Sequence, residues 1–143
     1  MTRFLLPLPE AVELVLFALE NARSGEIFVR KAPASTIQDL AQACLNIFEA
    51  DNEIVTIGIR EGEKIHETLV NHEELMGVEE YDEYYRIKPD MKMDYADYFN
   101  RGYANKIEKE SYTSNNTVRL TVTEIENLLL SLPEIRKELG NNV

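Results

Sequence analysis

The chain contains one cysteine and six glycines in 143 residues, and neither residue type occurs in a common disulfide or cofactor motif. A single cysteine excludes a disulfide within the chain. The glycines form no Gly-x-Gly-x-x-Gly or Gly-x-x-Gly-x-x-Gly pattern, which dinucleotide binding requires so that the backbone can approach the pyrophosphate. A Gly-x-Ser-x-Gly elbow and a phosphate loop are also absent. These absences predict that the chain alone binds no dinucleotide cofactor.

Basic residues are scarce relative to acidic ones. Fifteen lysines and arginines stand against 26 aspartates and glutamates, which gives a formal net charge of −11 and a pI near 4.6. Nucleic-acid binding needs a basic face, and attraction to an anionic membrane needs a basic cluster. The charge balance therefore argues against both partners, although one local arginine is enough to bind a phosphorylated ligand.

Long hydrophobic runs are also missing. No run of about 20 apolar residues exists, so no transmembrane helix is expected. Pro7 and Pro9 interrupt the apolar N-terminal stretch, which therefore does not resemble a signal peptide, and the cytoplasm is the expected location. Hydrophobic residues still make up 44% of the chain, enough for the core of one domain.

The first 50 residues predict a helix, a strand and a second helix. Residues 10–23 have the pattern of a helix that ends near Gly25, and residues 26–30 that of a short strand. The middle of the first helix, residues 14–19, is apolar nearly all round, so this helix requires burial on more than one side.

The second helix is predicted over residues 35–50. Ser35-x-x-Gln38 has the spacing of a capping box at its start. Cys44 falls on its apolar face, where we expect a buried structural thiol rather than a nucleophile.

The later part of the chain has weaker signals. Residues 84–87 predict a strand, residues 91–102 a loop with a short helix, and residues 112–117 a series of turns. A last helix is predicted to begin at Thr121, whose spacing to Glu124 fits a capping box.

The stretch with the clearest chemical content lies between these two regions. Residues 54–57 predict a strand and residues 63–72 a helix, so Arg60, Glu63 and Lys64 would lie at a strand-to-helix junction. An arginine fork suits a phosphate or diphosphate, and a carboxylate suits sugar hydroxyls. The first N–H groups of a helix favour an anion. The alternative is a solvated charged turn.

Two other patterns suggest chemistry, and we reject both. His66 and His72 are six residues apart and do not share a helical face, so no metal site is predicted. Tyr84-x-x-x-Lys88 would place a tyrosine and a lysine on one face of a helix, but Pro89 disfavours helix at the lysine.

The segment Arg60-Glu61-Gly62-Glu63-Lys64, after a predicted strand, resembles the nucleotide-sugar signature of extended short-chain dehydrogenase/reductases. More narrowly, the chain resembles the C-terminal part of bacterial UDP-N-acetylglucosamine 4,6-dehydratases and epimerases of the capsular-polysaccharide type. The stretches that also carry this resemblance, in order, are Thr2-Arg3-Phe4, Gly25-Glu26-Ile27-Phe28-Val29, Lys31-Ala32-Pro33-Ala34, Asp82-Glu83-Tyr84-Tyr85-Arg86-Ile87 and Tyr112-Thr113-Ser114-Asn115-Asn116-Thr117.

The resemblance implies a mixed α/β fold, the C-terminal substrate-binding lobe of such an enzyme, with a helix and a strand that would complete a Rossmann sheet. Residues 1–143 would form one substrate-binding region. Within it, residues 1–50 would be the helix–strand–helix edge of the nucleotide-binding fold, and residues 51–143 the substrate lobe and C-terminal extension. NAD or NADP and the catalytic residues would belong to an N-terminal portion. We therefore expect no catalytic, cofactor-binding or metal-binding residue in this chain.

The implied function is UDP-sugar binding within a dehydratase or epimerase of polysaccharide biosynthesis, without catalysis by this chain alone. Arg60 would bind the diphosphate and Glu63 the uridine ribose. Arg3 would lie near the sugar-nucleotide, and the alternative for it is a surface arginine.

The uncovered helix and strand predict a partner, either a separate N-terminal Rossmann lobe or a second copy of the chain. Two other possibilities remain open. The chain could be a non-catalytic binding or regulatory module, or a truncated gene product with no function of its own.

Overall fold

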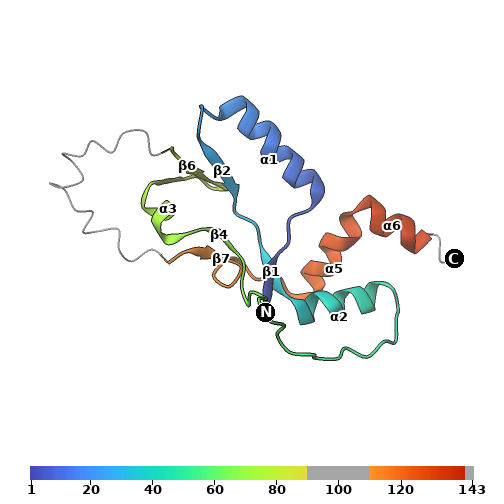
Figure 1. Ribbon diagram of the computed structural model, residues 1–143. Coiled ribbons are helices and arrows are strands. Elements are labelled where there is room, and N and C mark those ends of the chain that lie inside the picture. Colours follow the sequence, from blue (N-terminus) through green and yellow to red (C-terminus); the bar gives the residue numbers. More distant parts are fainter. Residues whose placement is uncertain (90–109, 141–143) are drawn as a thin grey trace, which may run out of the picture. The chain divides into compact units, whose positions relative to one another are not determined.

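A computed structural model describes residues 1–89 and 110–140 and shows a mixed α/β fold (Figure 1). The chain divides into two compact units whose segments alternate along the sequence. Unit 1 consists of Met1–Pro7, Ala32–Glu67 and Ser114–Val143, and unit 2 of Leu8–Lys31 and Thr68–Thr113. Both units combine segments from before and after residue 50, where the sequence predicts a division. The assignment of residues 1–143 to one substrate-binding region stays a prediction.

Unit 2 contains a helix packed on a three-stranded antiparallel sheet. The helix is α1 (Leu8–Asn21), and the strands in spatial order are β2 (Ile27–Arg30), β6 (Tyr84–Ile87) and β5 (Val78–Glu80).

Aromatic side chains hold α1 on this sheet. The ring of Phe17 lies edge-on to that of Phe28, with centroids 5.3 Å apart, and stacks on that of Tyr84 with centroids 4.6 Å apart. Pairs of this kind stabilise packing beyond the area that they bury. One face of α1 is therefore fixed against the sheet.

Two arginines of the sheet bind the carboxylates around it. Arg30 Nε lies 3.1 Å from Glu10 Oε2 of α1. Arg86 Nη2 donates to Glu26 Oε1 at 2.5 Å, and its Nη1 donates to Glu79 Oε2 at 3.2 Å. These contacts tie β6 to β5 and to the turn before β2.

The second strand pair of unit 2 carries its most buried side chains. β4 (Thr68–Val70) pairs antiparallel with β7 (Tyr112–Thr113), and α3 (His72–Met76) follows β4. Val70 and Tyr112 are buried together with Leu75 of α3.

Unit 1 combines a strand pair with three helices. β1 (Thr2–Phe4) pairs antiparallel with β3 (Ala34–Thr36), and the helices are α2 (Ile37–Ile47), α5 (Val122–Ser131) and α6 (Pro133–Gly140).

The core of unit 1 lies between α2 and α5. Ala43 of α2 and Ile125 of α5 are both fully buried. Asn46 Nδ2 donates to Glu126 Oε1 at 2.6 Å across the two helices. The two helices therefore bury apolar side chains against each other, and the hydrogen bond between Asn46 and Glu126 also joins them.

Three predicted elements are confirmed, the first two with shifted ends. The predicted helix over 10–23 is α1, the strand over 26–30 is β2, and the strand over 84–87 is β6. The capping box is also present, because Thr121 accepts from the backbone N–H of Glu124 while the Glu124 carboxylate accepts from that of Thr121. The predicted loop over 91–102 lies outside the described residues.

The predicted start of the second helix is wrong by one residue. The N-cap of α2 is Thr36, whose Oγ1 accepts from Asp39 N at 2.9 Å. Ser35 cannot take this role with Gln38, because it lies inside β3 with its side chain buried. Cys44 is half-buried, not buried as expected.

The strand predicted over 54–57 and the helix predicted over 63–72 are both wrong. Residues 51–60 pair with no strand in the described chain, and Ile57 is 73% exposed. Residues after the turn that contains Gly62 form β4 instead of a helix, because Thr68 and Val70 pair with β7. Arg60 and Glu63 therefore lie in a turn, and no helix N-terminus follows them.

Candidate functional site

The candidate site is built on the turn formed by residues 60–63. Arg60 N donates to Glu63 Oε2 at 3.1 Å, and Glu63 N donates to Arg60 O at 3.1 Å. Gly62 has a φ of +78°, in the left-handed region that residues with a Cβ rarely adopt. The sequence thus closes a tight turn, and that turn sets where the two side chains begin.

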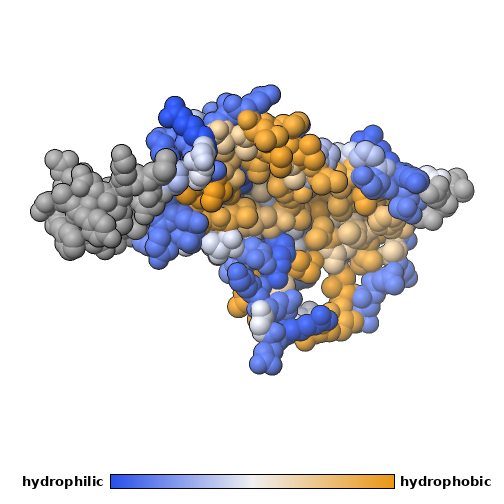
Figure 2. All heavy atoms as spheres, turned by 45° about the horizontal axis from the view of Figure 1, so that its top comes forward, coloured by the Kyte–Doolittle hydropathy of each residue, from blue (hydrophilic) through white to orange (hydrophobic). Residues whose placement is uncertain are grey.

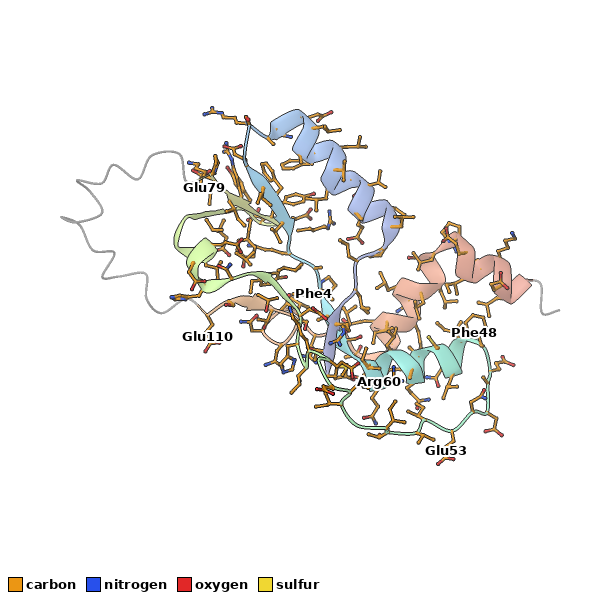
Figure 3. The ribbon with its side chains drawn as sticks, viewed as in Figure 1. Phe4, Phe48, Glu53, Arg60, Glu79 and Glu110 are labelled. Atoms are coloured by element: carbon orange, nitrogen blue, oxygen red, sulfur yellow. The ribbon has the colours of Figure 1, made fainter. Side chains whose placement is uncertain are left out.

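The basic side of this turn is open to solvent. Arg60 and Lys64 are exposed, and within the described residues neither side chain has a hydrogen bond or ion pair. Figure 3 labels Arg60 on the segment between α2 and β4. Its guanidinium keeps all five N–H donors, a geometry that suits phosphate oxygens. Glu63 uses Oε2 within the turn, so Oε1 remains to accept from a hydroxyl.

Arg3 of β1 holds the residues that follow the turn. Its Nη2 donates to the carbonyl of Lys64 at 3.0 Å, its Nη1 donates to the carbonyl of Thr2 at 2.7 Å, and its Nε lies 3.4 Å from Glu67 Oε1. The backbone adds a further contact, because Thr2 N donates to Ile65 O at 2.9 Å. The structure therefore brings Arg3 to Lys64, next to the turn, and its place near a sugar-nucleotide stays a prediction.

A buried hydroxyl pair lies beside Arg3. Thr2 and Ser114 are 3% and 0% exposed, and their hydroxyl oxygens are 2.7 Å apart. Thr2 Oγ1 also lies 2.7 Å from His66 Nδ1, and Ser114 Oγ accepts from Glu67 N at 2.9 Å. The pair therefore satisfies polar groups from three segments that are distant in sequence.

Sequence reasoning missed Thr2, Ser114 and the role of His66. Arg60, Glu63 and Lys64 are neighbours in sequence, so a motif groups them. Thr2 and Ser114 are 112 residues apart, and a single hydroxyl residue in a strand or turn has no pattern that marks a contact at that distance. No signal in one sequence would have found this pair.

The structure shows where the residues of the two rejected patterns lie. Tyr84 lies on β6, where its hydroxyl accepts from Arg30 Nη1 at 3.1 Å, and Lys88 binds Glu79. His66 contacts Thr2, whereas His72 begins α3. In the ranges 1–89 and 110–140, no group of three or more histidine, cysteine, aspartate or glutamate side chains could hold a metal ion.

A second candidate surface is the outer side of α1. Five large apolar side chains, exposed by 50% to 76%, are spaced so that they share the side of the helix opposite Phe17. We call this surface the α1 apolar face; it consists of Leu8, Val12, Val15, Leu16 and Leu19. Figure 2 shows hydrophobic atoms gathered over α1. Five large exposed apolar side chains on one side of a helix are more typical of an interface than of scattered surface residues.

Of the helices in the described part of the chain, none has both the length and the apolar content needed to cross a bilayer.

The comparisons with known proteins agree with the resemblance seen in the sequence. A family model described as polysaccharide biosynthesis protein matches residues 1–89, and one described as polysaccharide biosynthesis protein C-terminal matches residues 90–136. The chain belongs to this polysaccharide biosynthesis family, as the sequence predicts.

Individual relatives match only with part of their length. Proteins named UDP-glucose 4-epimerase from Rickettsia massiliae and Rickettsia conorii are each 47% identical to this chain over 142 residues, which is 99% of the chain and 42% of each relative. The structure described as Pen from Bacillus thuringiensis matches 92% of this chain with 38% of its own, at a TM-score of 0.71 and 26% identity. The chain thus spans less than half the length of these relatives.

Proposed function

We propose that this chain is the UDP-sugar-binding portion of a nucleotide-sugar epimerase or dehydratase of polysaccharide biosynthesis. The observation that carries the proposal is the Arg60 guanidinium, which is exposed and has no partner among residues 1–89 and 110–140, on a turn closed by Glu63. In a chain of net charge −11, an exposed arginine on a tight turn favours one local anion over a general basic surface. The names of the Rickettsia relatives indicate which anion to test first.

Each residue of the site has a distinct role in this proposal. Arg60 binds the diphosphate through its planar fork. Glu63 accepts from a ribose hydroxyl of the uridine through Oε1, because Oε2 is used in the turn. Arg3 contributes to the same site from β1, through the segment that it holds.

The sugar and the reaction are left to experiment. The relatives are named for UDP-glucose, whereas the sequence resemblance includes enzymes that act on UDP-N-acetylglucosamine. We assign the chain to the cytoplasm and to the synthesis of a surface polysaccharide such as capsule, where enzymes of this resemblance act. A non-catalytic binding module would use the same turn and would differ only in lacking activity with a partner.

A nicotinamide cofactor does not fit the residues of this chain. The positive-φ glycines of the described residues are Gly25, Gly58 and Gly62, and their sequence positions do not have the Gly-x-Gly-x-x-Gly spacing of a pyrophosphate cradle. In this proposal the NAD or NADP that the complete enzyme uses is therefore bound outside residues 1–143.

We propose that the α1 apolar face binds the portion of the enzyme that lies outside the match with the relatives. Two observations support this occupant. The chain covers 42% of each Rickettsia relative, so a larger portion remains to cover this face. β2 is an edge strand of its sheet within the described residues, and Ile27 on it is 53% exposed. That portion would add its Rossmann sheet next to α1 and β2.

A nuclear magnetic resonance titration of the ¹⁵N-labelled chain tests the binding function. UDP-glucose, and separately UDP-N-acetylglucosamine, should shift the amide signals of residues 58–67 in a saturable way. The amides of α6 serve as an internal control and should not move. No change at residues 58–67 with either compound at millimolar concentration would contradict the proposed site.

A further inference from the structure

We propose that Arg3 is a positioning residue, which fixes the Arg60 turn for the phosphate and does not itself contact the ligand. This inference rests on the proposed function, because it assigns Arg3 a role within that same site. Few hydrogen bonds hold the segment that carries Arg60.

Residues 51–59 have no hydrogen bond to the rest of the described chain. Within the described chain, residues 60–63 make only two hydrogen bonds, which join Arg60 and Glu63 to each other. Within the described residues, the turn therefore makes no hydrogen bond to the rest of unit 1. Its position depends on the end of α2 on one side and on residues 64–67 on the other.

Residues 64–67, in contrast, are held at every position. Arg3 binds the carbonyl of Lys64, and Thr2 N binds that of Ile65. Thr2 Oγ1 contacts His66 Nδ1, and Ser114 binds both the N–H and the carbonyl of Glu67. Arg3 makes the first of these contacts along the chain, so it is the anchor nearest to the turn.

The bonding of Arg3 also limits what else it can bind. Its Nη1, Nη2 and Nε are all directed to protein oxygens, of Thr2, Lys64 and Glu67. A guanidinium with each nitrogen engaged has little donor capacity left for a bidentate phosphate contact. The Arg60 guanidinium has no partner in the described residues, so all its N–H donors remain for a phosphate. The division of roles follows: Arg60 binds, and Arg3 places it.

The test compares Arg3→Gln with Arg136→Gln in the full chain. Arg136 is a matched control, because its Nε and Nη2 also donate to two backbone carbonyls, those of Leu130 and Ser131, at the end of α5. ¹⁵N relaxation should show the amide order parameters of Arg60 and Glu63 falling in Arg3→Gln, from roughly 0.85 toward 0.6. Arg136→Gln should leave both unchanged.

Binding of UDP-glucose then separates positioning from direct contact. Arg3→Gln should weaken binding by roughly two- to thirtyfold in the wild-type background. In an Arg60→Ala background the same change should have almost no effect, because a residue that acts through Arg60 loses its influence when Arg60 is absent. A loss that is equally large in both backgrounds would show that Arg3 contacts the ligand, and would overturn the inference.

Two further outcomes are decisive. Unchanged order parameters at Arg60 and Glu63 in Arg3→Gln would also overturn the inference. If the order parameters fall but no variant binds UDP-glucose, the proposed function fails while the positioning role stands. If Arg3→Gln does not fold, Glu67→Ala replaces it, because this change removes the carboxylate that Arg3 Nε contacts and should lower the same order parameters by a smaller amount.

Discussion

Arg60 and Arg86 have the same type of side chain in two different environments. Arg86 binds Glu26 and Glu79, and the contact with Glu26 raises its pKa above the ordinary arginine range. Arg60 has no protein partner in the described residues and lies in solvent. An arginine paired with carboxylates stabilises a fold, whereas an exposed arginine with no partner in the described residues is available to a ligand. This difference supports the proposal that Arg60 is the binding residue.

Replacing Arg60 by alanine should weaken UDP-glucose binding by roughly ten- to a hundredfold, since a charge-assisted bidentate contact contributes about 1.5–3 kcal/mol. Arg60→Lys should recover only part of this loss, because lysine cannot present a planar fork. Titration calorimetry measures all three proteins. Equal affinities of wild type and Arg60→Ala would remove Arg60 from the site.

The Glu26–Arg86 pair should make stability depend on pH in the acidic range. Donation from Arg86, with a further hydrogen bond from the backbone of Arg23, lowers the pKa of Glu26 below its ordinary value of 4.5. Stabilisation by a carboxylate with a lowered pKa is present above the ordinary value and is lost as the pH falls through the lowered one. The urea-unfolding midpoints of wild type and Glu26→Gln should therefore differ at pH 7 and converge at lower pH.

The control for this experiment is Glu53→Gln. Glu53 is exposed and has no recorded partner in the described residues, so its replacement should leave the midpoint unchanged across the same pH range. A difference between wild type and Glu26→Gln that persists below the lowered pKa would contradict the account of the pair.

Among the elements, those with a local cause were predictable. The capping box of Thr121 and Glu124 depends on residues three apart, and the apolar period of α1 is visible within one segment. The cap of α2 was misplaced, because whether Ser35 or Thr36 is the cap depends on where β3 ends, and β3 is defined by its pairing with β1.

The segment around the candidate site was the hardest part to predict. Residues 54–57 alternate as a strand does, but a strand also needs a partner, and none is present in the described chain. Residues 68–70 form a strand because they pair with β7, more than 40 residues later. The sequence thus groups Arg60 and Glu63 in one motif but could not show the contacts that hold residues 64–67 after them.

The turn between α1 and β2 depends on Gly25. Its φ of +84° is strained for any residue with a Cβ, and a Cβ there would lie 3.0 Å from Pro89 Cβ. Gly25→Ala should therefore destabilise the fold by at least about 1 kcal/mol. Urea unfolding measures this loss.

Gly77→Ala provides the comparison for Gly25→Ala. Gly77 has a φ of −103°, and the nearest atom to an added Cβ would be Glu74 O at 3.8 Å. This variant should change stability far less. If the two variants lose equal stability, backbone strain at Gly25 is not the cause.

At the scale of the whole molecule, the main observation is exposed apolar surface, which a self-contained protein would bury. The α1 apolar face and the exposed isoleucines of residues 54–65 together leave many large apolar side chains in solvent. Surfaces of this kind mark an interface or lead to self-association. This exposed surface supports the proposal that the chain is one portion of a larger enzyme, in agreement with its coverage of 42% of the Rickettsia relatives.

The chain alone should bind neither NAD nor NADP, because its glycines do not form a pyrophosphate cradle. Titration calorimetry with each cofactor should give no binding heat. Micromolar affinity for either cofactor would contradict this prediction and would require a cofactor site within residues 1–143.

The central claim is tested most directly by supplying the portion that the chain does not match. The corresponding portion of the Rickettsia massiliae UDP-glucose 4-epimerase is mixed with this chain, and epimerisation of UDP-glucose is measured together with sedimentation. Activity should require both components. Arg60→Ala should reduce it without dissociating the complex, whereas Leu16→Glu on the α1 apolar face should abolish both complex and activity. A chain that remains a stable monomer, or only self-associates, and gives no activity with this portion would contradict the account.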